Sequence, residues 1–94
     1  MVLEVAYVEV LDGHKEAFAA DLLTAASTVL PKAEGFIEFT GHGWGVERPS
    51  VYLFVIYWES VEHHMAFRAS EAFGEWRGLI GGHFAAPPVV EHFG

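Results

Sequence analysis

The residues best suited to chemistry are a histidine and an arginine four positions apart, His64 and Arg68. Positions i and i+4 share one face of a helix, so the two side chains can reach the same space. An imidazole can accept a proton near neutral pH, and a guanidinium can hold the anion that forms. We therefore expect His64 to act as a base and Arg68 to stabilise an anion. The alternative is a solvated helix edge on which His64 bonds to a neighbouring carboxylate.

Two further histidines could lie near such a site. His92 falls in the last predicted strand, where alternation places its side chain on the face opposite Glu91 and Phe93. It can therefore reach either a pocket or a subunit interface. A metal site built from His64, His83 and His92 has no ligand spacing to support it, so we assign no metal ligand.

Aromatic side chains could line an apolar binding site, with core packing as the alternative for each of them. Trp76 lies at the centre of the apolar face of its predicted helix. Tyr7 and Trp58 lie on predicted strands, where they could stack on a flat aromatic ligand.

Charge and composition exclude several classes of function. The 94 residues include five Lys and Arg against thirteen Asp and Glu, a formal net charge of −8. Nucleic-acid binding requires basic residues gathered on one face, and here they are few and scattered. The absence of cysteine removes thiolate catalysis, disulfides and Cys-ligated metal centres. No signal peptide or membrane-spanning run is present, so we expect a cytoplasmic protein that binds neither nucleic acid nor membrane.

The elements that must position these residues follow the order strand, helix, strand, strand, broken helix, strand. The predicted strands are residues 2–11, Phe36–Trp44, Val51–Trp58 and Val89–Phe93, and the predicted helices are residues 15–30, 61–69 and Glu71–Ile80. Asp12, Ser60 and Ser70 are the expected helix N-caps. This order predicts an α+β, ferredoxin-like βαββαβ fold in one domain, residues 1–94, with a four-stranded antiparallel sheet and helices on one face.

The predicted strand Val51–Trp58 is apolar on both faces. Helices cover only one face of such a sheet, so the other face must meet a further apolar surface. Hydrophobic residues make up 52% of the chain, more than one small core can hold. We therefore expect a homodimer whose two open sheet faces enclose a small barrel. The alternative is a monomer whose apolar sheet face binds a different partner.

Three segments of the sequence are typical of a known family. They are residues 58–62, WESVE; residues 67–79, with Phe67, Arg68, Phe73, Trp76 and Leu79; and the closing residues 88–93, PVVEHF. In these segments and in its order of elements, nearly the whole chain resembles the antibiotic biosynthesis monooxygenase domain. The resemblance implies a dimeric α/β barrel with a pocket between sheet and helices in each subunit. Some members are cofactor-independent oxygenases of hydroquinones or polyketide anthrones, and others degrade haem.

The haem-degrading branch matches this chain poorly. Its members use an Asn on the first strand, a Trp in the helix after the third strand and an iron-ligating His ten residues later. An ungapped comparison places Tyr7, Phe67 and Arg77 at these positions. None of them matches, and arginine cannot serve as an axial ligand, so haem degradation is disfavoured.

The resemblance and the residues together predict a monooxygenase of a small aromatic or quinol-type substrate, working without metal, flavin or other cofactor. His64 would deprotonate the substrate, and Arg68 would stabilise the anion while it donates an electron to O₂. The residues expected to contact the substrate are His92, Trp76, Tyr7, Phe67 and Trp58. The alternative function is a non-catalytic dimeric module that binds a small hydrophobic molecule.

Overall fold

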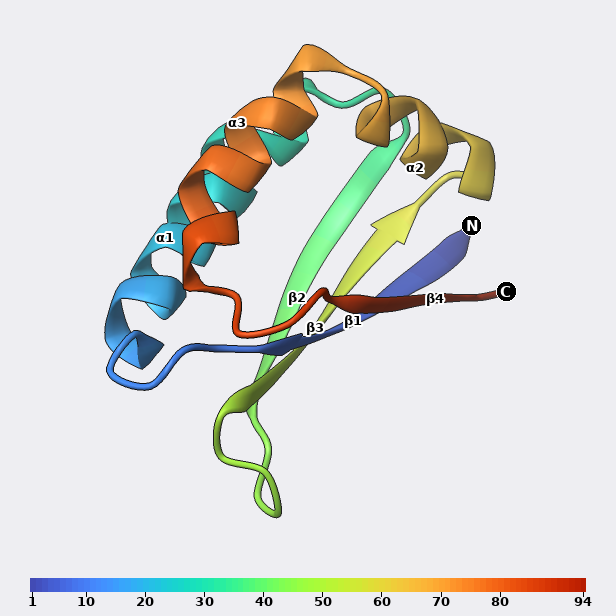
Figure 1. Ribbon diagram of the computed structural model, residues 1–94. Coiled ribbons are helices and arrows are strands. Elements are labelled where there is room, and N and C mark those ends of the chain that lie inside the picture. The colour runs from blue at the N-terminus through green and yellow to red at the C-terminus, as the bar shows by residue number, and fades with distance from the viewer.

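Four antiparallel strands form one sheet, and the helices lie together on one side of it (Figure 1). The computed structural model describes residues 1–94. The strands are β1 (Val2–Glu9), β2 (Phe36–Trp44), β3 (Val51–Trp58) and β4 (Val89–Phe93). The helices are α1 (Lys15–Thr28), α2 (Val61–Arg68) and α3 (Glu71–Ile80), with short 3₁₀ turns at Leu30–Lys32 and Gly81–His83. The strand order β2-β3-β1-β4 confirms the predicted ferredoxin-like fold.

The ends of β1 and α1 differ from the prediction by two residues each. β1 stops at Glu9 because Val10 pairs with Phe84 instead, in an isolated bridge outside the sheet. α1 stops at Thr28, and the chain then tightens into a 3₁₀ turn that contains Pro31. A proline has no N–H to continue an α-helical ladder, which accounts for the early end.

The three predicted N-caps have different outcomes. Ser60 caps α2, since its hydroxyl accepts a hydrogen bond from the His63 backbone N–H at 3.2 Å. Ser70 occupies the N-cap position of α3, but its hydroxyl donates to the Phe67 carbonyl oxygen at 2.6 Å. The prediction for Asp12 is wrong, because His14 occupies the N-cap position of α1 and makes no side-chain cap bond.

Strand alternation in β1 decides which side chains face the helices. Glu4, Ala6 and Val8 are all buried beneath the helices, whereas Tyr7 is 43% exposed on the opposite face. In the register of the sheet, Glu4 lies between Ile56 of β3 and His92 of β4. The core fills the space between this inner face and the helices; its largest fully buried side chains are Trp58, Phe18, Leu22, Leu30, Ile56 and Ile80.

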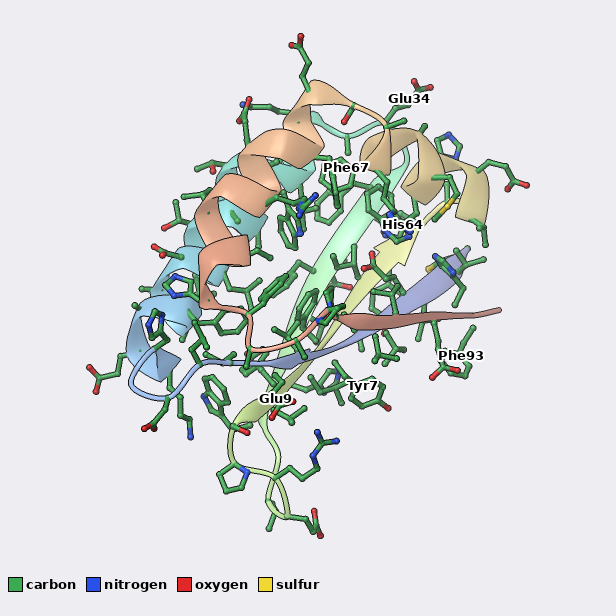
Figure 2. All side chains as sticks on the ribbon, viewed as in Figure 1. Tyr7, Glu9, Glu34, His64, Phe67 and Phe93 are labelled. Atoms are coloured by element: carbon green, nitrogen blue, oxygen red, sulfur yellow. The ribbon has the colours of Figure 1, made fainter.

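No helix of the chain covers the outer face of the sheet (Figure 1). Its side chains are mostly apolar, with Glu9, Glu38 and Glu91 as exceptions. Tyr7, Val89 and Phe93 are 43%, 56% and 50% exposed there. Figure 2 shows Tyr7 and Phe93 directed away from the helical layer. None of the helices is both long and apolar enough to cross a membrane.

Candidate active site

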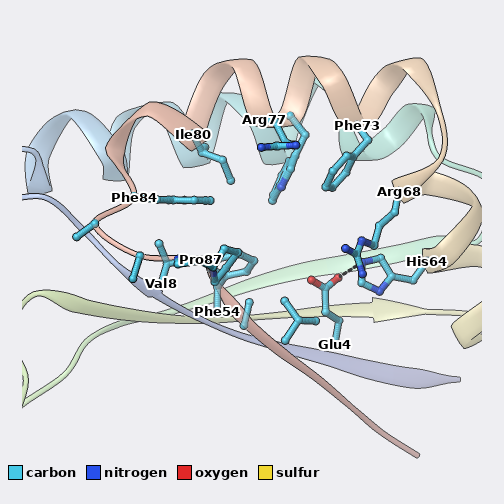
Figure 3. A pocket seen from close by; sticks show the side chains of 16 residues that line it. Glu4, Val8, Phe54, His64, Arg68, Phe73, Arg77, Ile80, Phe84 and Pro87 are labelled. Carbon is cyan, nitrogen blue, oxygen red and sulfur yellow. Dashed lines mark ion pairs between the residues drawn. The ribbon is translucent and has the colours of Figure 1, made fainter.

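A cavity of about 750 Å³ lies between the inner face of the sheet and α3 (Figure 3). Its volume is in the range of small-molecule binding sites. The segment 84–88, which joins the 3₁₀ turn to β4, forms one wall. Most of the lining is apolar, and the polar exceptions are Glu4, His64, Arg68 and Arg77. The cavity is therefore suited to a compact hydrophobic molecule that is recognised at a few points.

A chain of hydrogen-bonding side chains forms one end of this cavity. The Trp58 indole N–H donates to Glu4 Oε1 at 2.9 Å. His64 Nε2 lies 3.1 Å from the same oxygen, the contact drawn dashed in Figure 3. His64 Nδ1 lies 2.7 Å from His92 Nε2. β1, β3, α2 and β4 each contribute one member, so the cluster exists only in the folded chain.

His64 has a polar partner at each ring nitrogen. Nδ1 shares a hydrogen bond with His92 Nε2, and Nε2 lies in close N···O contact with Glu4 Oε1. Glu4 Oε2 has no hydrogen-bond partner within the chain. Because no polar side-chain atom is both fully buried and without a partner, this oxygen must be accessible from the cavity. Since Glu4 lines the cavity, Oε2 is the atom of the cluster left free to meet a bound molecule.

Burial controls the protonation of this pair. It raises the pKa of Glu4 from 4.5 to about 7, against the opposing effects of the Trp58 hydrogen bond and the Arg68 charge. Burial also lowers the pKa of His64 from 6.5 to about 4, with His92 and Arg68 acting in the same direction. Near neutral pH the 3.1 Å contact thus joins an uncharged imidazole to a carboxyl group that exchanges its proton close to pH 7.

Three of the predicted site residues line this cavity: His64, Arg68 and Trp76. His92 does not line it but is hydrogen-bonded to His64. His92 lies on the inner face of the sheet because it pairs with Glu4 across the β1–β4 register. The alternative interpretation placed His64 on a solvated helix edge, next to a carboxylate. A carboxylate does lie next to His64, but it belongs to Glu4, and both side chains are buried inside the fold.

Three predicted substrate contacts do not line the cavity. Trp58 is fully buried behind Glu4, and its 5.1 Å stacking on the His64 ring fixes that imidazole in place. Phe67 packs into the core between Trp58 and Trp76. Tyr7 lies on the outer face, because alternation along β1 directs it away from Glu4. Two of the three therefore support the site from behind, and Tyr7 belongs to a different surface.

The histidines 64, 83 and 92, whose spacing in the sequence is not that of metal ligands, are not assembled in the structure. His83 instead bonds to Asp21 Oδ2 through Nε2 at 2.7 Å and to His14 Nδ1 through Nδ1 at 3.0 Å. This second cluster joins α1 to the 3₁₀ turn Gly81–His83. No group of three His, Cys, Asp or Glu side chains is placed to hold a metal ion.

Sequence reasoning missed Glu4, the residue at the centre of the cluster. A carboxylate inside a valine-rich strand is usually assigned to the solvated face. Alternation places Glu4 on one face with Ala6 and Val8, but Leu3, Val5 and Tyr7 make the other face equally apolar, so the strand pattern alone did not show which face is buried. A carboxylate on a buried face is a candidate functional group because it needs a specific partner.

Comparison with known proteins places this chain in a family. The sequence model of the antibiotic biosynthesis monooxygenase family matches residues 1–79, and the chain belongs to this family. It is 30% identical to the uncharacterised protein YczJ of Bacillus subtilis over 94 residues, which cover 99% of this chain and 97% of YczJ.

Solved structures agree with this assignment. A Bordetella bronchiseptica protein named as a candidate antibiotic biosynthesis monooxygenase has 36% identity and a TM-score of 0.93, over 99% of this chain and 94% of that chain. A variant of SnoaB, a cofactor-independent oxygenase from Streptomyces nogalater, has a TM-score of 0.78 at 15% identity. That match covers 99% of this chain and 90% of SnoaB and shows the shared fold.

Proposed function

We propose that this protein is a cofactor-independent monooxygenase of a small phenolic or quinol-type aromatic molecule. The observation that carries the proposal is the free Glu4 oxygen beside His64 at one end of an apolar cavity. A phenol bound there would meet a proton acceptor whose pKa is raised to about 7, close to the optimum for general base catalysis at neutral pH. The general oxygenase character of the family supports the same conclusion.

The reaction requires the substrate itself to reduce oxygen. Proton transfer from a hydroquinone to the ionised Glu4 carboxylate gives a phenolate. The phenolate passes one electron to O₂, and the resulting radical and superoxide combine into a C–O–O bond at a ring carbon. Protonation of the peroxide and loss of water leave a hydroxyquinone. Overall, one hydroquinone and one O₂ give one hydroxyquinone and one water, so no external reductant is consumed.

The structure supports a division of roles among three side chains. Glu4 Oε2 accepts the proton, whereas His64 has both ring nitrogens engaged and holds Glu4 in position. This differs from the sequence-based expectation that His64 is itself the base. Arg68 lies beside the pair, and its charge lowers the pKa of Glu4, which favours the ionised acceptor. The same charge would stabilise the phenolate as it forms.

Oxygen uptake by metal-free protein tests the proposal. The assay would present hydroquinones, anthrones and catechols to the wild type and to the His64→Ala and Arg68→Ala variants. Arg48→Ala is the matched control, because Arg48 lies on the β2–β3 connection, outside the cavity. We expect protein-dependent uptake that is lost in both cavity variants and retained in the control. Full activity in His64→Ala and Arg68→Ala would refute the assignment.

Ligand binding without oxygen uptake across the panel would favour the alternative function. The protein would then be a dimeric module that sequesters or senses a small hydrophobic molecule in the same cavity. Saturable binding with no product and no oxygen consumption, measured on identical samples, separates this function from the oxygenase.

We further propose that two copies associate through the outer face of the sheet. The support is the apolar exposed surface around Tyr7, Val89 and Phe93, together with the dimeric character that is general in the family. Phe93→Lys should convert the dimer to a monomer in light scattering coupled to size exclusion. Leu23→Lys is the control, since Leu23 is 65% exposed on α1, away from that face. A monomeric wild type would exclude the dimer.

A further inference from the structure

The five basic residues of the chain differ in whether they have a partner. Lys32 makes a 2.8 Å ion pair with Glu75, and Arg48 lies 3.9 Å from Glu9. Lys15 lies over the Trp44 ring at 4.5 Å from its centroid. Arg68 and Arg77 have neither an ion pair nor a side-chain hydrogen bond, although the chain contains thirteen acidic residues. These two unpaired cations are also the two that line the cavity.

Arg68 and Arg77 lie at different places around the cavity. Arg68, at the end of α2, lies beside Glu4 and His64, whereas Arg77 extends from α3 between Phe73 and Ile80 (Figure 3). Both are exposed to solvent. Two guanidinium groups that line one cavity make its potential positive, and this favours a bound anion.

No group of the protein supplies this anion. Glu4 is the only acidic residue that lines the cavity. Its Oε1 is already engaged by Trp58 and His64, and burial keeps the pKa of its carboxyl high, so it offers little negative charge below pH 7. The apolar lining otherwise presents aromatic and aliphatic side chains, among them Phe54, Phe73 and Trp76. The cavity therefore combines an aromatic-compatible wall with an unmatched positive charge.

We propose that the ligand of this cavity is a hydroxylated aromatic carboxylate, bound with its carboxylate on Arg77 and its phenolic hydroxyl directed toward Glu4. This proposal rests on the proposed oxygenase function for the role of the hydroxyl, but the recognition of the carboxylate is independent of any reaction. A planar guanidinium matches a carboxylate through two parallel N–H···O bonds, which favours arginine over a point charge at such a position.

The test compares two ligands of one shape under anaerobic conditions. 2,5-Dihydroxybenzoate and 2,5-dihydroxybenzamide both carry the quinol, and only the first has a negative charge. Calorimetric titration, with quenching of tryptophan fluorescence as a second readout, should show the acid binding at least about tenfold more tightly to the wild type, as expected for a charge-assisted hydrogen-bonded pair. Arg77→Met should remove this preference, and Arg77→Lys should retain part of it.

Arg48→Met provides the matched control, because it removes an arginine that lies outside the cavity. Arg48→Met should keep the preference for the acid over the amide. If it lost that preference as fully as Arg77→Met, the effect would come from net charge alone and the proposal would be refuted. Equal binding of acid and amide by the wild type, or an unchanged preference in Arg77→Met, would also refute it. Arg77 is exposed, so its replacement should leave the fold intact, which an NMR spectrum checks.

The outcome also separates this inference from the proposed function. Preferential binding of the acid with no oxygen uptake would refute the oxygenase and support the anion site. Oxygen uptake with equal binding of acid and amide would refute the anion site and support the oxygenase.

Discussion

The chains Glu4–His64–His92 and Asp21–His83–His14 contain the same kinds of side chain in the same order, but they lie in different surroundings. In the first, the carboxylate and its histidine are 3.1 Å apart and the two histidines 2.7 Å. In the second, the corresponding distances are 2.7 Å and 3.0 Å. The side chains of Glu4 and His64 are only 7% and 5% exposed, compared with 42% for Asp21 and 14% for His83. The distances are thus similar, and burial is the main difference.

That difference shows why a carboxylate–histidine pair becomes a candidate catalytic group at one place only. Water around Asp21 stabilises its charge and screens its interaction with His83. Burial removes this solvation from Glu4 and His64 and penalises the charged form of each, so both favour the neutral state near neutral pH. The buried pair can therefore exchange a proton with a bound molecule at little cost, and it opens on a cavity that can hold one.

The largest expected effect concerns activity. Glu4→Gln should lower the turnover number for oxygen uptake by at least about 100-fold, as expected for loss of a general base, because an amide cannot accept the proton. Asp21→Asn makes the same chemical change in the exposed cluster and should leave turnover within about twofold of the wild type. Comparable losses in the two variants would show that burial does not set the clusters apart.

The next effect concerns folding stability at pH 7, measured by urea unfolding. His64→Ala should lower the free energy of unfolding by about 2 to 4 kcal/mol, since it opens a cavity and removes a polar neighbour of buried Glu4. His83→Ala should lower it by about 1 kcal/mol or less, because Asp21 becomes solvated when its partner is removed. A larger loss for His83→Ala than for His64→Ala would reverse the comparison.

The pH dependence of stability gives a smaller but more specific effect. The pKa of Glu4 is raised from 4.5 to about 7 on folding, so its contribution to stability falls as pH rises through that interval. The pKa of His64 is lowered from 6.5 to about 4, so its contribution rises with pH between those values. In the pH range where both groups titrate, their effects on folding stability have opposite signs. Folding there transfers one proton from His64 to Glu4 with no net release, so the two effects cancel in the wild type.

Single substitutions should expose each slope. Relative to the wild type, Glu4→Gln should become more stable as pH rises from 4.5 to 7, by up to about 1.4 kcal/mol per pH unit, because the falling contribution of Glu4 is removed. His64→Ala should become less stable, relative to the wild type, as pH rises from about 4 to 6.5, because the rising contribution of His64 is removed. Urea unfolding at several pH values measures both trends, with Asp21→Asn as the control. If the stability of Glu4→Gln and His64→Ala changed with pH in the same way as that of the wild type, the claim that folding favours the uncharged forms of Glu4 and His64 would be contradicted.

The fold was predictable from the sequence because its signals are local. Apolar spacing, Pro31 and the Ser60 cap each act within a few residues, and the order of elements then leaves one simple topology. The His64–Arg68 spacing likewise brought two cavity residues together. The errors at the ends of β1 and α1 arise from the bridge between Val10 and Phe84 and from a 3₁₀ turn, which depend on distant contacts and on local tightening.

The site was only partly predictable because its partners come from distant parts of the chain. Glu4 acquires its role from Trp58, 54 residues away, and His64 from His92, 28 residues away. Neither spacing has a motif. Tyr7 was assigned to the ligand because it is aromatic and lies on a strand, but the phase of β1, set by Glu4, Ala6 and Val8, directs it outward. The strand phase seen in the structure makes Glu4, and not Tyr7, the β1 residue that can contact a ligand in the cavity.

The central claim is that Glu4 is a buried carboxyl that exchanges its proton near neutral pH. Carbon-13 NMR of protein labelled at the glutamate side-chain carboxyls measures this directly, and the resonance missing from Glu4→Gln identifies the residue. The account predicts that this resonance titrates with a midpoint near pH 7, the value to which burial raises the pKa of Glu4. A midpoint near the ordinary value of 4.5 would mean a fully ionised carboxylate at neutral pH and would contradict the account.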